Sequence, residues 1–81
     1  MTQAERVAAR LRERADSQAL ACARLGVEPY AGVHEDRAVA ALVEQTQQLI
    51  DDAKMEYGKN AGVDAEAAVQ ALAVALGIKE E

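Results

Sequence analysis

The stretch Val39–Tyr57 reads VAALVEQTQQLIDDAKMEY and decides the fold that we expect. Its apolar residues recur at the spacing of one face of an α-helix. Acidic and amide side chains fill most positions between them, and Gly58 follows directly, where a helix end commonly needs a left-handed residue. The stretch therefore predicts an amphipathic helix over about residues 35–57, with one face in the core and an acidic outer face.

The segment before this helix predicts another long helix. Thr2 and Glu5 have the spacing of a capping box, which starts a helix, and Gly26 sits where that helix would stop. The prediction is a helix over about residues 2–25 with a heptad-like apolar stripe. From Ala19 onward the pattern is apolar on two sides, so we expect this end to be clamped against the other helices. The N-terminal half is then free to project from the body or to lie across a partner.

The segment after the acidic helix predicts a third, shorter helix over about residues 65–76. Asp64 is a suitable N-cap for it. Residues 61–72 share several letters with residues 31–42, and this similarity places His34 at the start of the second helix, as its N-cap. The prediction is an all-α fold with three helices in one domain, residues 1–81. The second and third helices form a helical hairpin, and the longer N-terminal helix packs against it.

The predicted core is small. The chain has no Phe or Trp, and Ala, its commonest residue, buries little apolar area. Ten residues of the second and third helices are expected to form the core. They are Val39, Leu42, Val43, Leu49, Ile50, Ala53, Tyr57, Val69, Leu72 and Leu76. A chain of this length is often marginally stable alone, so we expect it to gain core from another subunit.

Composition and charge exclude several classes of function. The net charge of −5 argues against general nucleic-acid binding. It is uneven, at about +1 over residues 1–33 and about −5 over residues 34–78. No apolar run reaches the length of a membrane span, no signal peptide is evident, and a single cysteine, Cys22, forms no intramolecular disulfide. We expect a protein that is made and kept in the cytoplasm.

The residues with chemical potential do not form a catalytic pattern. His34 is the only histidine, and its acidic neighbours diverge around a helix, so we expect capping rather than metal binding. Cys22 lies on an apolar stripe and is expected to be a small core residue. Asp51 and Asp52 are adjacent, so they point about 100° apart on a helix. We therefore predict a protein without enzymatic activity, cofactor or metal.

The first helix carries a candidate docking surface. Arginines flank one side of its apolar stripe, an arrangement that suits contacts with carboxylates or phosphates around an apolar centre. The candidate partner-binding residues are Arg6, Val7, Arg10, Leu11, Arg14, Ala15 and Gln18, with Met55 of the second helix. A lone polar residue such as Gln18 in an apolar stripe can fix an oligomeric state. The alternative is an ordinary solvated helix face.

Residues 25–78 resemble the small all-helical head–tail connector (adaptor) proteins of tailed phages. The residues that carry the resemblance are Leu25-Gly26, Glu35-Asp36, Leu42, Leu49-Ile50, Ala53, Tyr57, Val63, Ala68-Val69, Leu72 and Leu76. The long heptad helix at the N-terminus and the short last loop depart from the family pattern. The resemblance implies a ring-forming structural subunit that binds a portal or neighbouring virion proteins, made in the host cytoplasm and found in the virion.

These observations favour a non-enzymatic structural or assembly protein that acts through helix-mediated contacts, by self-association or within a larger assembly. A phage connector or capsid-associated subunit is the most specific form of this hypothesis. The alternative is a small acidic regulator, antitoxin-like or anti-repressor, that masks a basic partner. A nucleic-acid binder that uses the arginine flank is a third hypothesis, against which the net charge argues.

Overall fold

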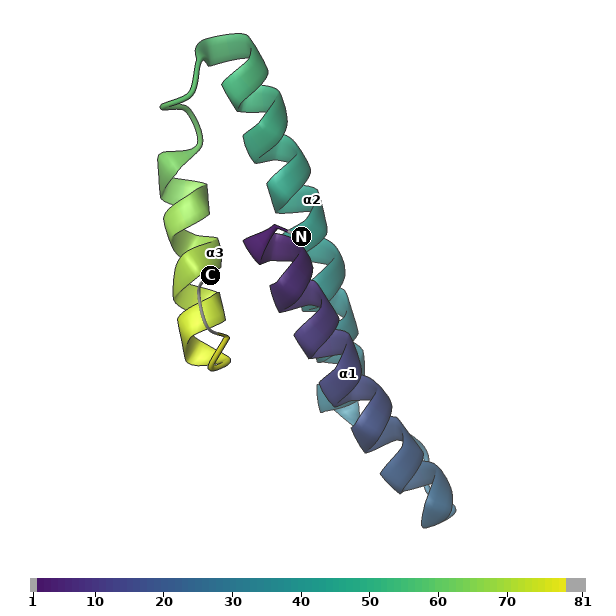
Figure 1. Cartoon of the computed structure of the whole chain (residues 1–81). Coiled ribbons are helices and arrows are strands. Elements are labelled where there is room, and N and C mark those ends of the chain that lie inside the picture. The colour runs from purple at the N-terminus through teal and green to yellow at the C-terminus, as the bar shows by residue number, and fades with distance from the viewer. Residues whose placement is uncertain (1, 79–81) are drawn as a thin grey trace.

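The computed structural model describes residues 2–78 and confirms the all-α fold. Three helices and no strand occur in this range: α1 (Gln3–Arg24), α2 (Ala31–Tyr57) and α3 (Val63–Ala75) (Figure 1). They contain 22, 27 and 13 residues respectively. The molecule is elongated, with extents of 51 × 23 × 18 Å.

The helices form an offset three-helix arrangement. α1 and α2 run antiparallel and make the most extensive contact, whereas α2 and α3 make the least. Figure 1 shows α3 returning beside the upper part of α2, with the start of α1 lying between them. Beyond that point α1 and α2 continue as a two-helix hairpin. The expected pairing of the second and third helices is present, but it is the least extensive of the three contacts.

The N-terminal half of α1 packs against both other helices and does not project, which reverses the sequence-based expectation; the C-terminal half buries Ala15 and Cys22. Four residues of its first three turns are buried with residues from both other helices. The buried cluster consists of Ala4, Val7, Ala8, Leu11, Ala40, Val43, Val69 and Ala73. The alanines at the contact allow close approach of the helix backbones, so valine and leucine side chains suffice to fill the space. In the C-terminal half, Leu20 remains 54% exposed.

The ends of α1 follow the predicted local chemistry. The Thr2 hydroxyl accepts a hydrogen bond from the Glu5 backbone N–H at 3.1 Å, which caps the helix. At the other end Gly26 has a φ of +73°, and the Val27 N–H donates to the Cys22 carbonyl at 3.0 Å. This pairing is a Schellman motif, in which a left-handed glycine closes the last turn.

Two predicted helix starts are wrong. α2 begins at Ala31 after an extended Tyr30, so His34 lies within the first turns and is not the N-cap. α3 begins at Val63, because the preceding Gly62 has a φ of +75° and ends the loop in a left-handed conformation. Asp64 is therefore in the first turn of α3, where its negative charge interacts favourably with the positive end of the helix dipole.

Candidate protein-interaction surface

α2 carries two parallel heptad stripes, and only one of them faces the core. The inner stripe contains Val33, Ala40, Val43 and Ile50, all of which are buried. The outer stripe lies about 110° further around the helix, given about 100° per residue. Its members are Val39, Leu42, Thr46, Leu49 and Ala53. Leu42 and Leu49, its two largest side chains, are 59% and 69% exposed.

This division corrects the predicted core. Val43, Ile50 and Val69 are buried as predicted, and Ala53, Leu72 and Leu76 are half-buried. Four predicted core residues are exposed and the prediction for them is wrong. They are Val39, Leu42, Leu49 and Tyr57. The physical reason is the position of α1, which packs on the valine and alanine stripe of α2 and leaves the leucine stripe uncovered.

The outer stripe continues onto α3. Helical geometry places Ala65, Leu72 and Leu76 on the edge of α3 that meets α2, and all three are half-buried. Ala68 and Ala75 lie one step further round and are exposed. The opposite edge of α3 faces α1. The two uncovered edges therefore form one surface on the side of the α2–α3 contact away from α1.

We call this surface the outer apolar face. It comprises Leu42, Thr46, Leu49, Ala53, Ala65, Ala68, Leu72 and Ala75. Exposed apolar residues that occur singly are normal on protein surfaces, but a contiguous stripe on two neighbouring helices marks an interaction site. A fourth helix packed along this surface would complete a four-helix bundle.

The candidate docking residues of α1 are mostly engaged within the chain. Val7, Leu11 and Ala15 are buried, so the prediction that they contact a partner is wrong. Of the remaining residues, Arg10 and Met55 are exposed and Gln18 is half-buried. The apolar stripe of α1 is therefore core, and it does not form a docking surface.

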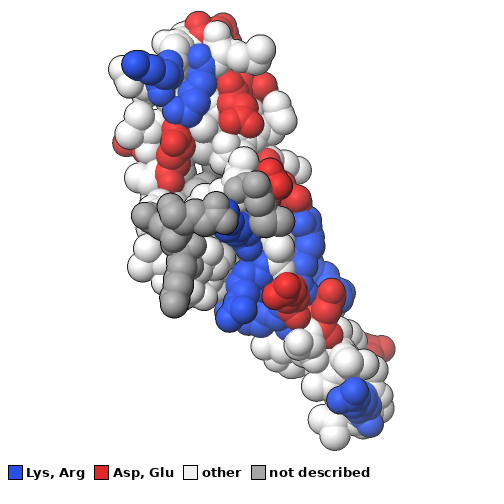
Figure 2. Space-filling model, in the orientation of Figure 1, with Lys and Arg blue, Asp and Glu red and all other residues white. Residues whose placement is uncertain are grey.

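One arginine of the predicted docking surface, Arg14, joins α1 to α2, as does Arg12 from outside that surface. Arg14 donates two hydrogen bonds to the Asp36 carboxylate, and Arg12 pairs with Glu44. A third pair runs the other way, from Arg37 of α2 to Asp16 at 3.1 Å. Arg6 also takes part in an interaction within the chain. Figure 2 shows blue side chains gathered over the middle of α1, with red side chains beside them.

These pairs shift the ionisation of the acids that accept them. The hydrogen bond from Arg14 lowers the pKa of Asp36, and the one from Arg12 lowers the pKa of Glu44. In both cases burial opposes the lowering of the pKa, and the positive charge of the arginine adds to it. The sequence contained a signal for these pairs, because basic residues cluster in α1 and acidic residues in α2. The predicted docking surface included Arg14 and did not include Arg12.

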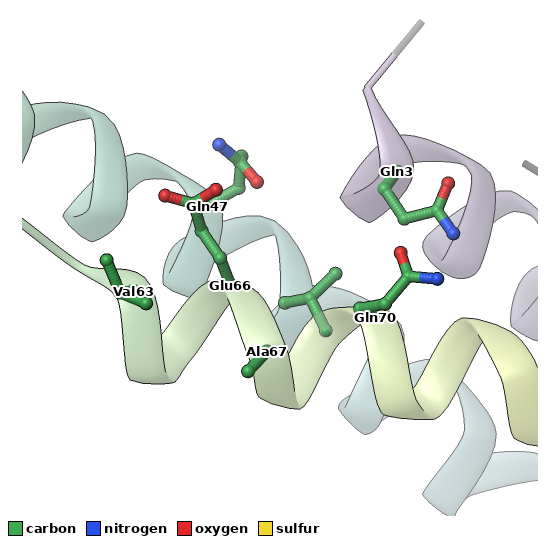
Figure 3. Close-up of a pocket in the computed structure, with 7 residues that line it drawn as sticks. Gln3, Gln47, Val63, Glu66, Ala67 and Gln70 are labelled. Atoms are coloured by element: carbon green, nitrogen blue, oxygen red, sulfur yellow. The ribbon is translucent and has the colours of Figure 1, made fainter. Parts of the chain in front are cut away.

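A small pocket of about 370 Å³ lies where the start of α1 meets α2 and α3. Its polar lining is three amides, from Gln3, Gln47 and Gln70, and the Glu66 carboxylate. Figure 3 shows the Gln3 and Gln70 side chains pointing toward one another across it. Gln3 Nε2 is buried without a hydrogen-bond partner among the described residues. The one ionisable group in the lining, the Glu66 carboxylate, forms an ion pair with Lys54.

The remaining residues with chemical potential lie apart from one another. Cys22 is buried on α1. His34 is exposed on α2, and Asp51 and Asp52 accept hydrogen bonds from Gln47 and Gln48 at 2.9 and 3.0 Å. Over residues 2–78, no three His, Cys, Asp or Glu side chains are grouped so that they could hold a metal ion. No helix in this part of the chain has the length and apolar character needed to cross a bilayer.

Comparison with known proteins gives no relative: no protein-family model, curated protein or solved structure matches this chain.

Proposed function

We propose that this chain is a non-enzymatic assembly protein that acts through helix-mediated protein contacts, with the outer apolar face as its docking surface. The observation that carries the proposal is the exposure of Leu42 and Leu49 on a heptad stripe that no part of residues 2–78 covers. Leucine at heptad spacing is the usual means by which one helix packs on another.

The surface area of the chain supports this proposal. A folded monomer of 8.6 kDa is expected to expose about 4,700 Å². This chain exposes 5662 Å². A stable protein–protein interface buries about 800 Å² on each partner, so the surplus is of the size that an interface removes.

The more specific form of the proposal is a virion component made in the host cytoplasm. It rests on the resemblance of residues 25–78 to the head–tail connector proteins of tailed phages. A ring of subunits would let each chain gain core from its neighbours, which would account for the small core of this chain.

A second candidate function is a small acidic regulator that masks a basic partner. The observation that favours it is the acidic outer surface of α2, which carries Glu35, Asp52 and Glu56. Both candidates use the same face of the molecule, and they differ in the identity of the partner.

The experiment compares the wild-type chain with a Leu42→Ser/Leu49→Ser variant and a Gln45→Ser/Gln48→Ser control on the same helix. Light scattering gives the mass in solution, and fluorescence anisotropy measures binding of a three-heptad peptide with Leu and Ala on its stripe and Gln on its flanks. We expect self-association or peptide binding that the leucine variant loses and the control keeps. A wild-type chain that stays monomeric and binds no such peptide contradicts the proposal.

A further inference from the structure

The outer apolar face has an acidic rim. Each residue of a helix turns by about 100°, which places Asp52 and Glu56 along the edge of the stripe on α2 beyond Leu49, and Glu35 in line with the stripe at its N-terminal end. Asp64 takes the equivalent place on α3. All four side chains are exposed. The rim therefore presents four negative charges around an apolar centre.

No positive charge from α2 or α3 offsets this rim. The two helices are described throughout, and their only basic residues are Arg37 and Lys54. Arg37 turns toward α1, where it pairs with Asp16. Lys54 pairs with Glu66, whose side chain lines the pocket on the α1 side of α3. The charge that α2 and α3 themselves place around the outer apolar face is thus negative, and the loop between them adds one basic residue, Lys59.

This distribution argues against a second copy of the chain as the occupant. The stripe is centred near Thr46, with Glu35 eleven residues before it and Glu56 ten residues after it. An antiparallel copy would place Glu35 of one chain beside Glu56 of the other. A parallel copy would place each glutamate beside its own equivalent. Like charges in facing positions cost binding free energy and act against such pairs.

We propose that the outer apolar face binds one amphipathic helix of a different protein, with an apolar stripe flanked by Lys or Arg. The stripe from Glu35 to Glu56 has the length of about three heptads, or roughly 30 Å at 1.5 Å per residue. The partner helix is therefore about 20 residues long. Its apolar stripe covers Leu42 and Leu49, and its basic flanks meet the acidic rim. This inference rests on the proposed function and adds the chemistry of the partner.

The test uses three fluorescent peptides of three heptads with the same Leu and Ala stripe, and with Lys, Gln or Glu on both flanks. Anisotropy titrations with the full chain give the three dissociation constants. We expect the Lys peptide to bind about tenfold more tightly than the Gln peptide, since several exposed ion pairs each contribute a fraction of 1 kcal/mol. The Glu peptide binds most weakly, and the preference for Lys decreases with added salt.

Two variants test whether the acidic rim causes the preference for the Lys peptide. Glu35→Gln/Glu56→Gln removes two rim charges, and Glu13→Gln/Glu28→Gln removes two exposed charges from elsewhere while giving the same net charge. We expect the first variant to lose most of its preference for the Lys peptide and the second to keep it. Circular dichroism of both variants checks that the helices persist.

The outcomes separate this inference from the proposed function. Equal binding of the Lys and Gln peptides, or self-association that Leu42→Ser/Leu49→Ser abolishes, overturns the inference while the outer apolar face remains a docking surface. A chain that is monomeric and binds none of the three peptides overturns both. A preference for the Lys peptide that survives Glu35→Gln/Glu56→Gln overturns the role of the rim.

Discussion

Arg14 of α1 holds the Asp36 carboxylate of α2 in a bidentate ion pair, in which Nε donates at 2.8 Å and Nη2 at 2.7 Å. Asp36 is only 13% exposed at its side chain, whereas Arg14 reaches it from the solvent side. Bidentate geometry fixes the relative position of the two groups more strictly than a single hydrogen bond does. The pair therefore supports the register in which the buried cluster holds α1 along α2.

Acidification is expected to weaken the pairing of α1 with α2. The pKa values of Asp36 and Glu44 are lower in the folded chain than in the unfolded chain, because Arg14 and Arg12 stabilise the carboxylates. The contribution to the free energy of unfolding is therefore complete above the ordinary carboxylate pKa and is lost as pH falls through the lowered values. Urea unfolding followed by circular dichroism over a pH series measures it.

The control for this prediction is Asp36→Asn, which cannot ionise. We expect its urea midpoint to be lower than that of the wild type at neutral pH, and the difference to shrink as the wild type is acidified. A constant difference across the pH series would show that the ion pair does not contribute through ionisation.

Replacement of Leu11 by Ala tests the position of the core. Leu11 is 2% exposed in the buried cluster, so Leu11→Ala is expected to lower the free energy of unfolding by about 2–4 kcal/mol. Leu20→Ala is the same change on the same helix at a side chain that is 54% exposed, and we expect a loss of less than about 1 kcal/mol. Similar losses for the two variants in urea unfolding would contradict the packing of the N-terminal half of α1.

Replacement of Gly62 by Ala tests the turn before α3. Gly62 has a φ of +75°, and a Cβ there would lie 3.2 Å from Ile50 Cγ2. Gly26 has a similar φ of +73° with no neighbouring atom in reach of a Cβ. Both Gly→Ala changes are expected to cost about 1 kcal/mol for the left-handed backbone. Gly62→Ala is expected to cost more because Ile50 must also move. A smaller loss at Gly62 than at Gly26 would refute this account of the turn.

The sequence specified the helices and their ends better than their packing. The Thr2 cap and the Gly26 stop of α1 depend on residues close in the chain, so local chemistry predicts them. The start of α2 was misplaced because the resemblance of residues 31–42 to residues 61–72 suggested an N-cap at His34. The extended Tyr30 ends the loop earlier. Nothing in the segment itself distinguishes these two starts.

The inward face of α2 was less predictable, and the reason is physical. Its two stripes have the same heptad spacing, and the one with Leu42 and Leu49 has the larger side chains, so hydrophobicity favours it as core. The choice depends on α1, whose small Ala4 and Ala8 fit the valine and alanine stripe. Packing complementarity between segments distant in the chain is not encoded in the spacing of either one.

The candidate docking surface consists largely of residues whose direction on α2 the sequence pattern did not predict. The leucine stripe predicted as core is exposed, and Arg14, predicted to contact a partner, pairs with Asp36 within the chain. The apolar stripe of α1, predicted as a docking surface, is packed inside the molecule. The stripe of α2, predicted as core, lies with the edge of α3 on the exposed surface. The uneven charge of the chain was a usable signal, since opposite charges on α1 and α2 favour their mutual pairing.

The central claim is that a helix docks on the outer apolar face, and backbone amide NMR shifts test it most directly. The isotopically labelled chain is titrated with the three-heptad peptide that carries Lys on its flanks. We expect shifts to concentrate on residues 42–53 of α2 and 65–75 of α3, and Leu42→Ser/Leu49→Ser to abolish them. Shifts concentrated on the exposed side of α1 around Arg10, or no saturable shifts at all, would contradict the account.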